Sequence, residues 1–205
     1  MRLMYRLMQT ICQVGFIYYL HGRVFGRENV PASGGVLLAC NHQSFLDPVL
    51  AGVGLTRECH FMARDSLFRQ PQFRRLITFL NSFPVRRASA DMTAMKEAIR
   101  RLRAGAALVI FPEGTRTKDG SIGPLLPGPV LLAKRAGVPI VPVFVSGAFE
   151  SWPRNRPLPR PGYVTVRYGE PLTVEQVEAW PEQRIIDELR ERMLTLAAHR
   201  SRNQE

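Results

Sequence analysis

Residues 36–48 read VLLACNHQSFLDP, a run of five apolar residues that ends at a polar segment. A short, unbroken apolar run is typical of a strand that is buried on both faces of a parallel sheet. In open α/β sheets, ligands bind beyond the carboxyl ends of such strands. We therefore expect Val36–Cys40 to be a strand and the polar segment after it to form part of a functional site.

The same pattern recurs along the chain, where short apolar runs alternate with segments of helical periodicity. The further strand candidates are Cys59–Ala63, Ala107–Phe111, Ile140–Val145 and Tyr163–Tyr168. Helices are expected over 91–104 and 128–137, and a capping box of Thr173 and Gln176 begins a helical tail. Four prolines make residues 152–162 an extended surface loop. The predicted fold class is α/β, with a central, mixed but mostly parallel sheet flanked by helices.

Residues 2–20 predict a helix whose polar residues, Arg2, Arg6, Gln9 and Gln13, form one narrow stripe on an otherwise apolar surface. This distribution is typical of a helix in the bilayer interface, with its arginines directed toward lipid phosphates. The alternatives are a helix docked in the core of the same domain and a cleaved signal peptide. No apolar stretch reaches the length of about 20 residues that a membrane-spanning helix needs.

The charge of the chain indicates an anionic partner. It has 28 lysines and arginines against 17 acidic residues, a formal net charge of +11. Nucleic acid, an acidic bilayer surface, and a phosphorylated substrate or carrier are all compatible with this charge. A merely basic surface is the simpler alternative. The three cysteines have no CxxC spacing, which argues against a disulfide framework or a zinc site and suits a reducing cytosol.

The first candidate site is the polar segment after the first strand. His42 and Asp47 are five residues apart in it and can meet across a turn. A carboxylate that accepts the Nδ1 proton fixes the imidazole tautomer and stabilises the imidazolium, as general base catalysis requires. A structural, hydrogen-bonded histidine is the alternative reading of this pair.

The second candidate site is Phe111–Arg116, FPEGTR, at the end of another apolar strand. Gly114 permits a tight turn with exposed N–H groups, Thr115 adds a hydroxyl donor, and Arg116 supplies a planar fork that matches phosphate oxygens. Glu113 can orient the arginine or accept a hydrogen bond from a substrate hydroxyl. The alternative is a solvent-exposed hairpin turn.

These two blocks, NHxxxxD at 41–47 and FPEGTR at 111–116, closely resemble those of the glycerol-phosphate and lysophosphatidate acyltransferase family. The resemblance extends from Val36 to near Leu172. It implies that Arg87, at the end of the FPVRR block, binds the substrate phosphate, and that the VPIVPV segment at 138–143 lines the acyl side of the site.

The resemblance also implies the organisation and the activity of the chain. Residues 1–30 would form a membrane-interface helix with its lead-in, and residues 31–205 an acyltransferase domain at the cytoplasmic face of the membrane. The expected reaction moves a fatty acyl group from acyl-CoA or acyl carrier protein to the sn-2 hydroxyl of 1-acylglycerol 3-phosphate, giving phosphatidate. His42 and Asp47 would be catalytic, and no cofactor or metal ion is expected.

Alternatives to this reading remain within the family and outside it. Glycerol 3-phosphate or another lysolipid could be the acceptor, because Asn81 stands where a glycine is usual in the family and Arg64 where many relatives have lysine. The expected partners are a membrane lipid substrate, an anionic membrane surface and acyl carrier protein. A basic nucleic-acid-binding protein is the alternative of another class, but no aromatic platform or basic recognition helix supports it, and nucleic acid is not expected as a partner.

Overall fold

The computed structural model describes residues 2–86 and 91–198, which form a seven-stranded sheet in the order β1-β7-β6-β2-β5-β3-β4. The strands are β1 (Arg23–Phe25), β2 (Val36–Cys40), β3 (Cys59–Arg64), β4 (Ser82–Val85), β5 (Ala107–Ile110), β6 (Ile140–Ser146) and β7 (Thr165–Tyr168). Every neighbouring pair is parallel except β6 and β7. The predicted mixed, mostly parallel α/β sheet is therefore confirmed.

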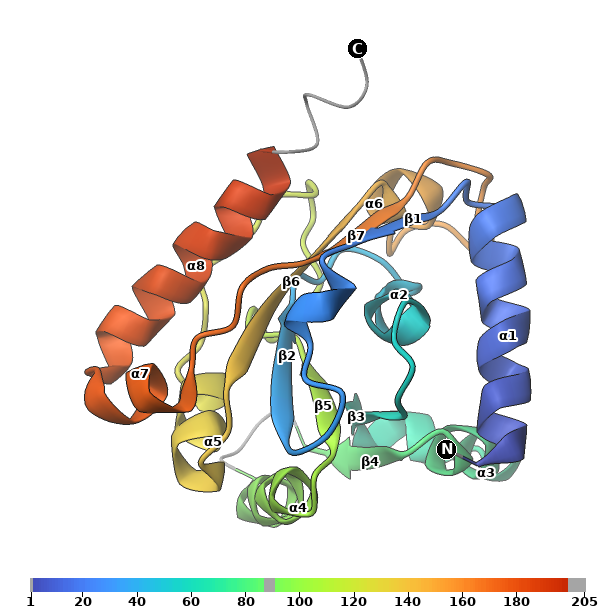
Figure 1. Cartoon of the computed structure of the whole chain (residues 1–205). Coiled ribbons are helices and arrows are strands. Elements are labelled where there is room, and N and C mark those ends of the chain that lie inside the picture. Colours follow the sequence, from blue (N-terminus) through green and yellow to red (C-terminus); the bar gives the residue numbers. More distant parts are fainter. Residues whose placement is uncertain (1, 87–90, 199–205) are drawn as a thin grey trace.

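Helices cover both faces of this sheet (Figure 1). They are α1 (Leu3–Tyr18), α2 (Asp47–Val53), α3 (Pro71–Phe79), α4 (Met92–Arg103), α5 (Gly128–Ala136), α6 (Ala148–Ser151), α7 (Val174–Ala179) and α8 (Glu182–Ala198), with 3-10 turns η1 (Arg27–Asn29) and η2 (Asp65–Phe68). The helices α4, α5, α7 and α8 pack on one face, and α2 packs on the other with α1 outside it.

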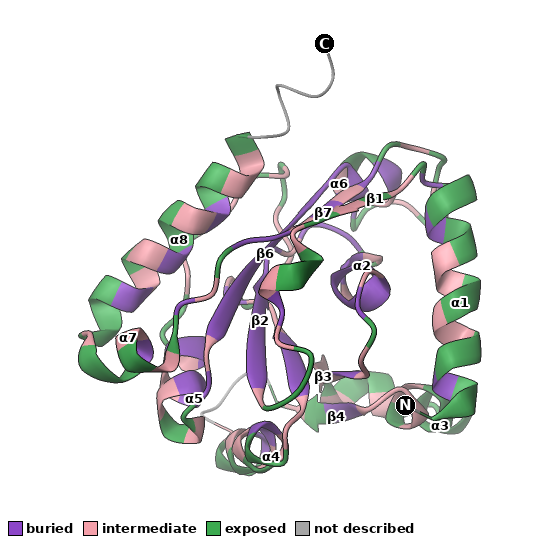
Figure 2. Ribbon diagram, in the orientation of Figure 1, coloured by how far each residue is buried: buried purple, intermediate pink, exposed green. Residues whose placement is uncertain are grey.

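Two apolar cores result, one on each face of the sheet, and β2 contributes to both. Val36, Leu38 and Cys40 belong to the core beneath α2. Leu37 and Ala39 belong to the core beneath the other helices. Side chains of a strand alternate between the faces, and all five of these residues are fully buried, which explains the unbroken apolar run (Figure 2).

The predicted elements differ from the observed ones mainly at their ends. The strand expected over Ala107–Phe111 ends at Ile110, and the strand expected from Tyr163 begins at Thr165. The short edge strands β1 and β4 were not predicted, because three or four residues give too little periodicity. β1 lies within the predicted lead-in and pairs with β7. Residues 152–162 contain no helix or strand, as expected.

Three of the four polar residues of the α1 stripe bind the protein, so the expectation that its arginines point to lipid phosphates is wrong for Arg2, whereas Arg6 is exposed. Arg2 donates hydrogen bonds to Glu58 and to the Asn81 side chain. The Gln9 amide donates to the carbonyls of Gly52 and Leu55, and Gln13 donates to the carbonyl of Val53. The final carbonyls of a helix have no partner within it, so the two glutamines satisfy the carboxyl end of α2.

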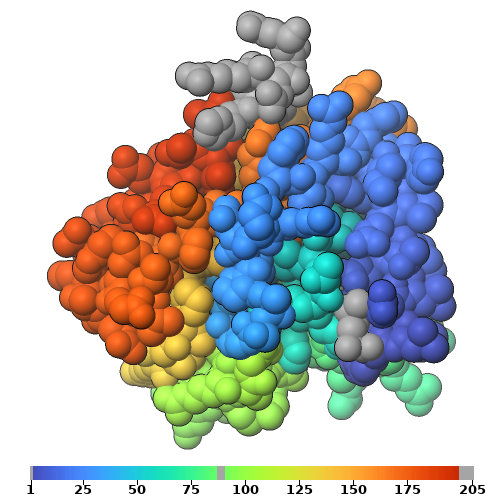
Figure 3. All heavy atoms as spheres, in the orientation of Figure 1, coloured from blue at the N-terminus to red at the C-terminus, as the bar shows by residue number. Residues whose placement is uncertain are grey.

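The opposite face of α1 is apolar and exposed. The large side chains on it are Leu3, Met4, Leu7, Ile11, Val14, Ile17 and Tyr18, all more than half exposed. Figure 3 shows the helix, in dark blue, along one margin of the molecule. Across the described ranges 2–86 and 91–198, no helix is both long enough and apolar enough to cross a bilayer.

Candidate active site

The fold brings the two sequence motifs to the same edge of the sheet. β2 and β5 are adjacent parallel strands, with Ala39 opposite Ile110. The chain leaves β2 into the segment that carries His42, and it leaves β5 into the segment that carries Glu113 and Arg116. Both segments therefore lie beyond the carboxyl ends of the strands, as the apolar runs indicated.

His42 and Asp47 form the expected pair. His42 Nδ1 lies 2.8 Å from Asp47 Oδ2, and the Asp47 side chain is completely buried. The same carboxylate oxygen accepts the backbone N–H groups of Gln43 at 2.6 Å and Ser44 at 2.7 Å. In a neutral imidazole that donates from Nδ1 to this oxygen, Nε2 presents a lone pair.

The second motif holds the backbone of His42 from both sides. Glu113 Oε1 accepts the His42 N–H at 2.8 Å, and the Thr117 N–H donates to the His42 carbonyl at 2.8 Å. Glu113 Oε2 accepts the N–H of Gly123 at 3.1 Å. Burial raises the pKa of the Glu113 carboxyl, although these two backbone hydrogen bonds act in the opposite direction. Glu113 thus positions the backbone of His42. The expected contact of Glu113 with a substrate hydroxyl stays a prediction.

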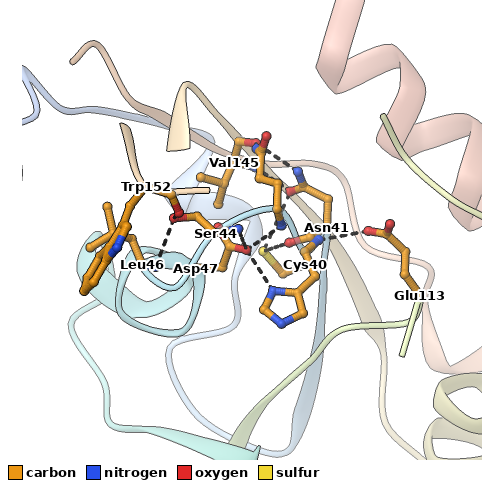
Figure 4. A network of polar contacts seen from close by, with 10 residues as sticks. Cys40, Asn41, Ser44, Leu46, Asp47, Glu113, Val145 and Trp152 are labelled. Atoms are coloured by element: carbon orange, nitrogen blue, oxygen red, sulfur yellow. Dashed lines mark hydrogen bonds and ion pairs between the residues drawn. The ribbon is translucent and has the colours of Figure 1, made fainter. Parts of the chain in front are cut away.

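The segment after β2 is also fixed to β6. The Asn41 side chain donates to the Val145 carbonyl at 2.9 Å and accepts the Val145 N–H at 2.7 Å. The Gln43 amide donates to the same carbonyl. Figure 4 shows the Asn41 side chain directed toward Val145 and the Glu113 carboxylate directed toward the start of this segment. Hydrogen bonds of Asn41, Gln43 and Glu113 thus fix the backbone on both sides of His42.

Comparison with known proteins settles the family. A family model described as Acyltransferase matches residues 21–146, more than half of the chain. The chain belongs to the acyltransferase family. This acyltransferase is 32% identical over 151 residues to the 1-acyl-sn-glycerol-3-phosphate acyltransferase of Bacillus subtilis (strain 168), an alignment that covers 73% of each chain.

A plant relative and a solved structure agree with this assignment. The 1-acyl-sn-glycerol-3-phosphate acyltransferase of Cocos nucifera is 31% identical over 149 residues, which cover 71% of this acyltransferase and 47% of the coconut protein. The crystal structure of the 1-acyl-sn-glycerophosphate (LPA) acyltransferase from Thermotoga maritima superposes with a TM-score of 0.84 at 26% identity. That superposition covers 97% of this chain and 80% of the Thermotoga chain.

The remaining site residues predicted for the acyltransferase lie in and around the turn after β5. Gly114 adopts a φ of 68° and its N–H donates to the Phe111 carbonyl at 3.0 Å, which forms the expected tight turn. Thr115 is exposed at this turn, and Arg116 follows it, partly buried. Arg87 lies outside the described residues. The neighbouring Arg86 is exposed beyond the end of β4, at the same edge of the sheet as His42.

Two contacts at the site were not predicted from the sequence. The His42 ring stacks on Phe111, with ring centroids 4.0 Å apart. The Arg116 guanidinium carbon lies 3.7 Å from the centroid of Phe45, a residue between His42 and Asp47 in the chain. The only sequence signal for either contact was the place of each aromatic residue inside or beside a motif.

A separate hollow of about 650 Å³ lies at the opposite edge of the sheet, where β3 and β5 begin. Its walls include Arg57, His60 and Arg101, and neither motif contributes to it. Arg57 donates to three backbone carbonyls, and Arg101 donates to His60, to Glu97 and to a backbone carbonyl. These guanidinium groups bind the protein itself, so we assign the chemistry to the His42 edge.

Proposed function

We propose that this acyltransferase transfers a fatty acyl group from acyl-CoA or acyl carrier protein to the sn-2 hydroxyl of 1-acylglycerol 3-phosphate, giving phosphatidate. The observation that carries the proposal is the His42–Asp47 pair, in which the 2.8 Å contact at Nδ1 leaves Nε2 as the base. The names of the Bacillus and coconut relatives support the choice of acceptor.

In the proposed reaction, His42 Nε2 removes the proton of the acceptor hydroxyl while that oxygen attacks the thioester carbonyl carbon. Asp47 stabilises the imidazolium that forms. The tetrahedral intermediate then collapses, the carbon–sulfur bond breaks, and the departing thiolate takes the proton from the imidazolium. The new ester and a free thiol leave, and His42 returns to its neutral form.

The neighbours of His42 support direct transfer, without an acyl-enzyme. Burial raises the pKa of the Cys40 thiol well above its usual range, with smaller contributions from the Asp47 and Glu113 carboxylates, so the reactive thiolate is disfavoured. The Ser44 hydroxyl is fully buried and donates to the Trp152 carbonyl at 2.8 Å. Neither group is available as a nucleophile. The described residues hold no cluster of three or more His, Cys, Asp or Glu side chains suited to a metal ion.

Recognition of the acceptor phosphate would fall to Arg116, the turn at Gly114 and Thr115, and Arg87. A guanidinium donates two parallel hydrogen bonds to phosphate oxygens. Arg64 and Arg86 also stand at the ends of neighbouring strands at this edge. Between residues 64 and 103 the chain has ten basic and three acidic side chains. Arg64 and Arg86 of this stretch would also attract the acidic phosphates of coenzyme A or acyl carrier protein, whereas Arg101 lies at the opposite edge of the sheet.

The same proposal places α1 in the interface of the cytoplasmic face of the membrane. Its glutamines are bonded to α2, whereas Leu7, Ile11 and Val14 project outward. Apolar side chains on the outer face of a surface helix gain free energy when they enter the acyl region of a bilayer. Because α1 also packs on the catalytic domain, the active site would be held beside its lipid substrate.

An acceptor panel tests the proposed function. The purified chain is given labelled acyl-CoA or acyl carrier protein thioester together with 1-acylglycerol 3-phosphate, glycerol 3-phosphate, lysophosphatidylcholine or monoacylglycerol. We expect the highest kcat/KM with 1-acylglycerol 3-phosphate and a large loss with monoacylglycerol, which lacks the phosphate. Equal rates with 1-acylglycerol 3-phosphate and monoacylglycerol would contradict phosphate recognition. A preference for glycerol 3-phosphate would show that it, rather than 1-acylglycerol 3-phosphate, is the acceptor.

A further inference from the structure

Phe45 occupies an unusual position for a large apolar side chain. It belongs to neither apolar core and is 46% exposed, although it lies inside the segment that carries His42 and Asp47. Core packing therefore does not explain it. Its ring instead contacts two other side chains of the active-site edge.

The guanidinium of Arg116 lies over the Phe45 ring. The guanidinium carbon is 3.7 Å from the Phe45 ring centroid, well inside the distance of about 6 Å at which a cation and an aromatic ring attract each other. Stacking uses the flat face of a guanidinium. The N–H donors lie in the plane of the group, so stacking is compatible with an in-plane grip on a phosphate.

The other contact of Phe45 is Trp152, at the start of the loop between β6 and β7. The two ring centroids are 5.3 Å apart, with a tilt of 44°. The Trp152 carbonyl accepts the Ser44 hydroxyl at 2.8 Å, and its indole N–H donates to the Arg156 carbonyl at 3.1 Å. Phe45 thus also contacts a residue whose own backbone and ring are both hydrogen-bonded.

We propose that Phe45, supported by Trp152, is a positioning residue that fixes the plane and the place of the Arg116 guanidinium for the phosphate of the acceptor. An arginine side chain has many rotamers, and ordering it only when substrate binds would weaken that binding. The stack orders it beforehand. It also joins the phosphate-binding group to the same short segment that holds His42, so base and anchor keep a constant separation. This inference rests on the proposed function of Arg116.

The expected signature is a change in KM for the phosphorylated acceptor with little change in kcat. Loss of the stack in Phe45→Leu should raise that KM about fivefold, which corresponds to about 1 kcal/mol at 1.36 kcal/mol per tenfold. Phe45→Tyr keeps an aromatic face and should restore the KM to within about twofold. Because Phe45 is half-exposed, neither change should move the melting temperature by more than a few degrees.

A double-mutant cycle tests whether Phe45 acts through Arg116. Wild type, Phe45→Leu, Arg116→Ala and the double variant are assayed with 1-acylglycerol 3-phosphate. We expect Arg116→Ala to raise KM strongly and Phe45→Leu to add nothing further in that background. A fivefold effect that persists in the double variant, or no effect of Phe45→Leu in the presence of Arg116, overturns the inference.

Two further arms complete the design. If Arg116→Ala leaves KM unchanged, the proposed phosphate anchor itself fails, whatever Phe45 does. If Phe45→Leu lowers the melting temperature, fluorinated phenylalanine at position 45 keeps the shape of the ring and weakens its attraction for a cation. KM should then rise with the degree of fluorination, and a constant KM across the fluorinated series would reject a positioning role.

Discussion

Replacing Asp47 with asparagine isolates the charge of the carboxylate from its geometry. Asp47 Oδ2 accepts three N–H groups at once, from His42, Gln43 and Ser44. An asparagine oxygen in the same place can accept all three, whereas its NH₂ group would face those donors if the amide were reversed. With the oxygen in that place, the NH₂ group occupies the position of Asp47 Oδ1, which is buried and has no hydrogen-bond partner among the described residues. Asp47→Asn should therefore keep the imidazole in place and remove the negative charge beside it, at the cost of one buried, unpaired NH₂ group.

The magnitude follows from the charge-assisted hydrogen bonds. Loss of a buried, 2.8 Å partner of the developing imidazolium removes about 3–4 kcal/mol of transition-state stabilisation. At 1.36 kcal/mol per tenfold, kcat should fall about 10²- to 10³-fold. The KM for the acceptor should stay within about twofold, because Asp47 does not touch substrate in the proposed mechanism.

The assay compares kcat, KM and the melting temperature of Asp47→Asn and Asp47→Ala. Alanine leaves the buried N–H groups of Gln43 and Ser44 without an acceptor, which costs about 1–3 kcal/mol for each group. Asp47→Ala should therefore unfold at a lower temperature than Asp47→Asn, in which only the NH₂ group lacks a partner. A kcat for Asp47→Asn within threefold of the wild-type value would refute the role assigned to the carboxylate.

Three further changes address other parts of the molecule. Glu113→Gln keeps an acceptor for only one of the two backbone N–H groups, so kcat should fall about tenfold with little change in KM; a raised acceptor KM at unchanged kcat would instead indicate direct contact with substrate. Ile11→Asp puts a charge on the outer face of α1 and should reduce cosedimentation with anionic liposomes, whereas Thr10→Asp, at the exposed flank of the same helix, should reduce it less. Equal retention by both variants would argue against membrane contact through that face. Burial, followed by the charge of Arg101, lowers the pKa of His60 to about 4 from its usual 6.5. As pH falls, His60 is therefore protonated in the unfolded chain before it is protonated in the folded chain. The free energy of unfolding should decrease as pH falls from 6.5 toward 4. His60→Asn keeps an acceptor for Arg101 and should make the free energy of unfolding, measured with urea at several pH values, less dependent on pH. The same pH dependence in His60→Asn and wild type would contradict the role assigned to His60.

The predictable part of the fold came from buried strands whose residues are all apolar. The run at 36–40 is fully buried on both faces, and its five apolar residues predict such a buried strand. The short edge strand β4 contains Pro84 and carries no such signal. Asn81 adopts a φ of 64°, a backbone conformation that favours glycine, where the chain turns into β4. Its side chain also bonds Glu58, an interaction that no sequence pattern indicates.

The predictable part of the site was the chemistry of single residues rather than their mutual contacts. His42 and Asp47 could be paired because both lie in one segment beside the end of a strand. The contact between Glu113 and the His42 backbone could not be predicted, since it joins residues 71 positions apart through a main-chain group. The direction of Gln9 and Gln13 could not be predicted for a similar reason. A glutamine that satisfies the end of α2 and a glutamine that faces water give the same helical periodicity.

The most direct measurement of the central claim is single-turnover acyl transfer by His42→Ala. The variant receives a labelled acyl thioester and saturating 1-acylglycerol 3-phosphate, with His60→Asn as a matched histidine control from the opposite edge of the sheet. With a circular dichroism melt like that of the wild type, His42→Ala should transfer at least about 10²-fold more slowly, and His60→Asn should transfer at the normal rate. Near-normal transfer by a folded His42→Ala would contradict the assignment of His42 Nε2 as the base.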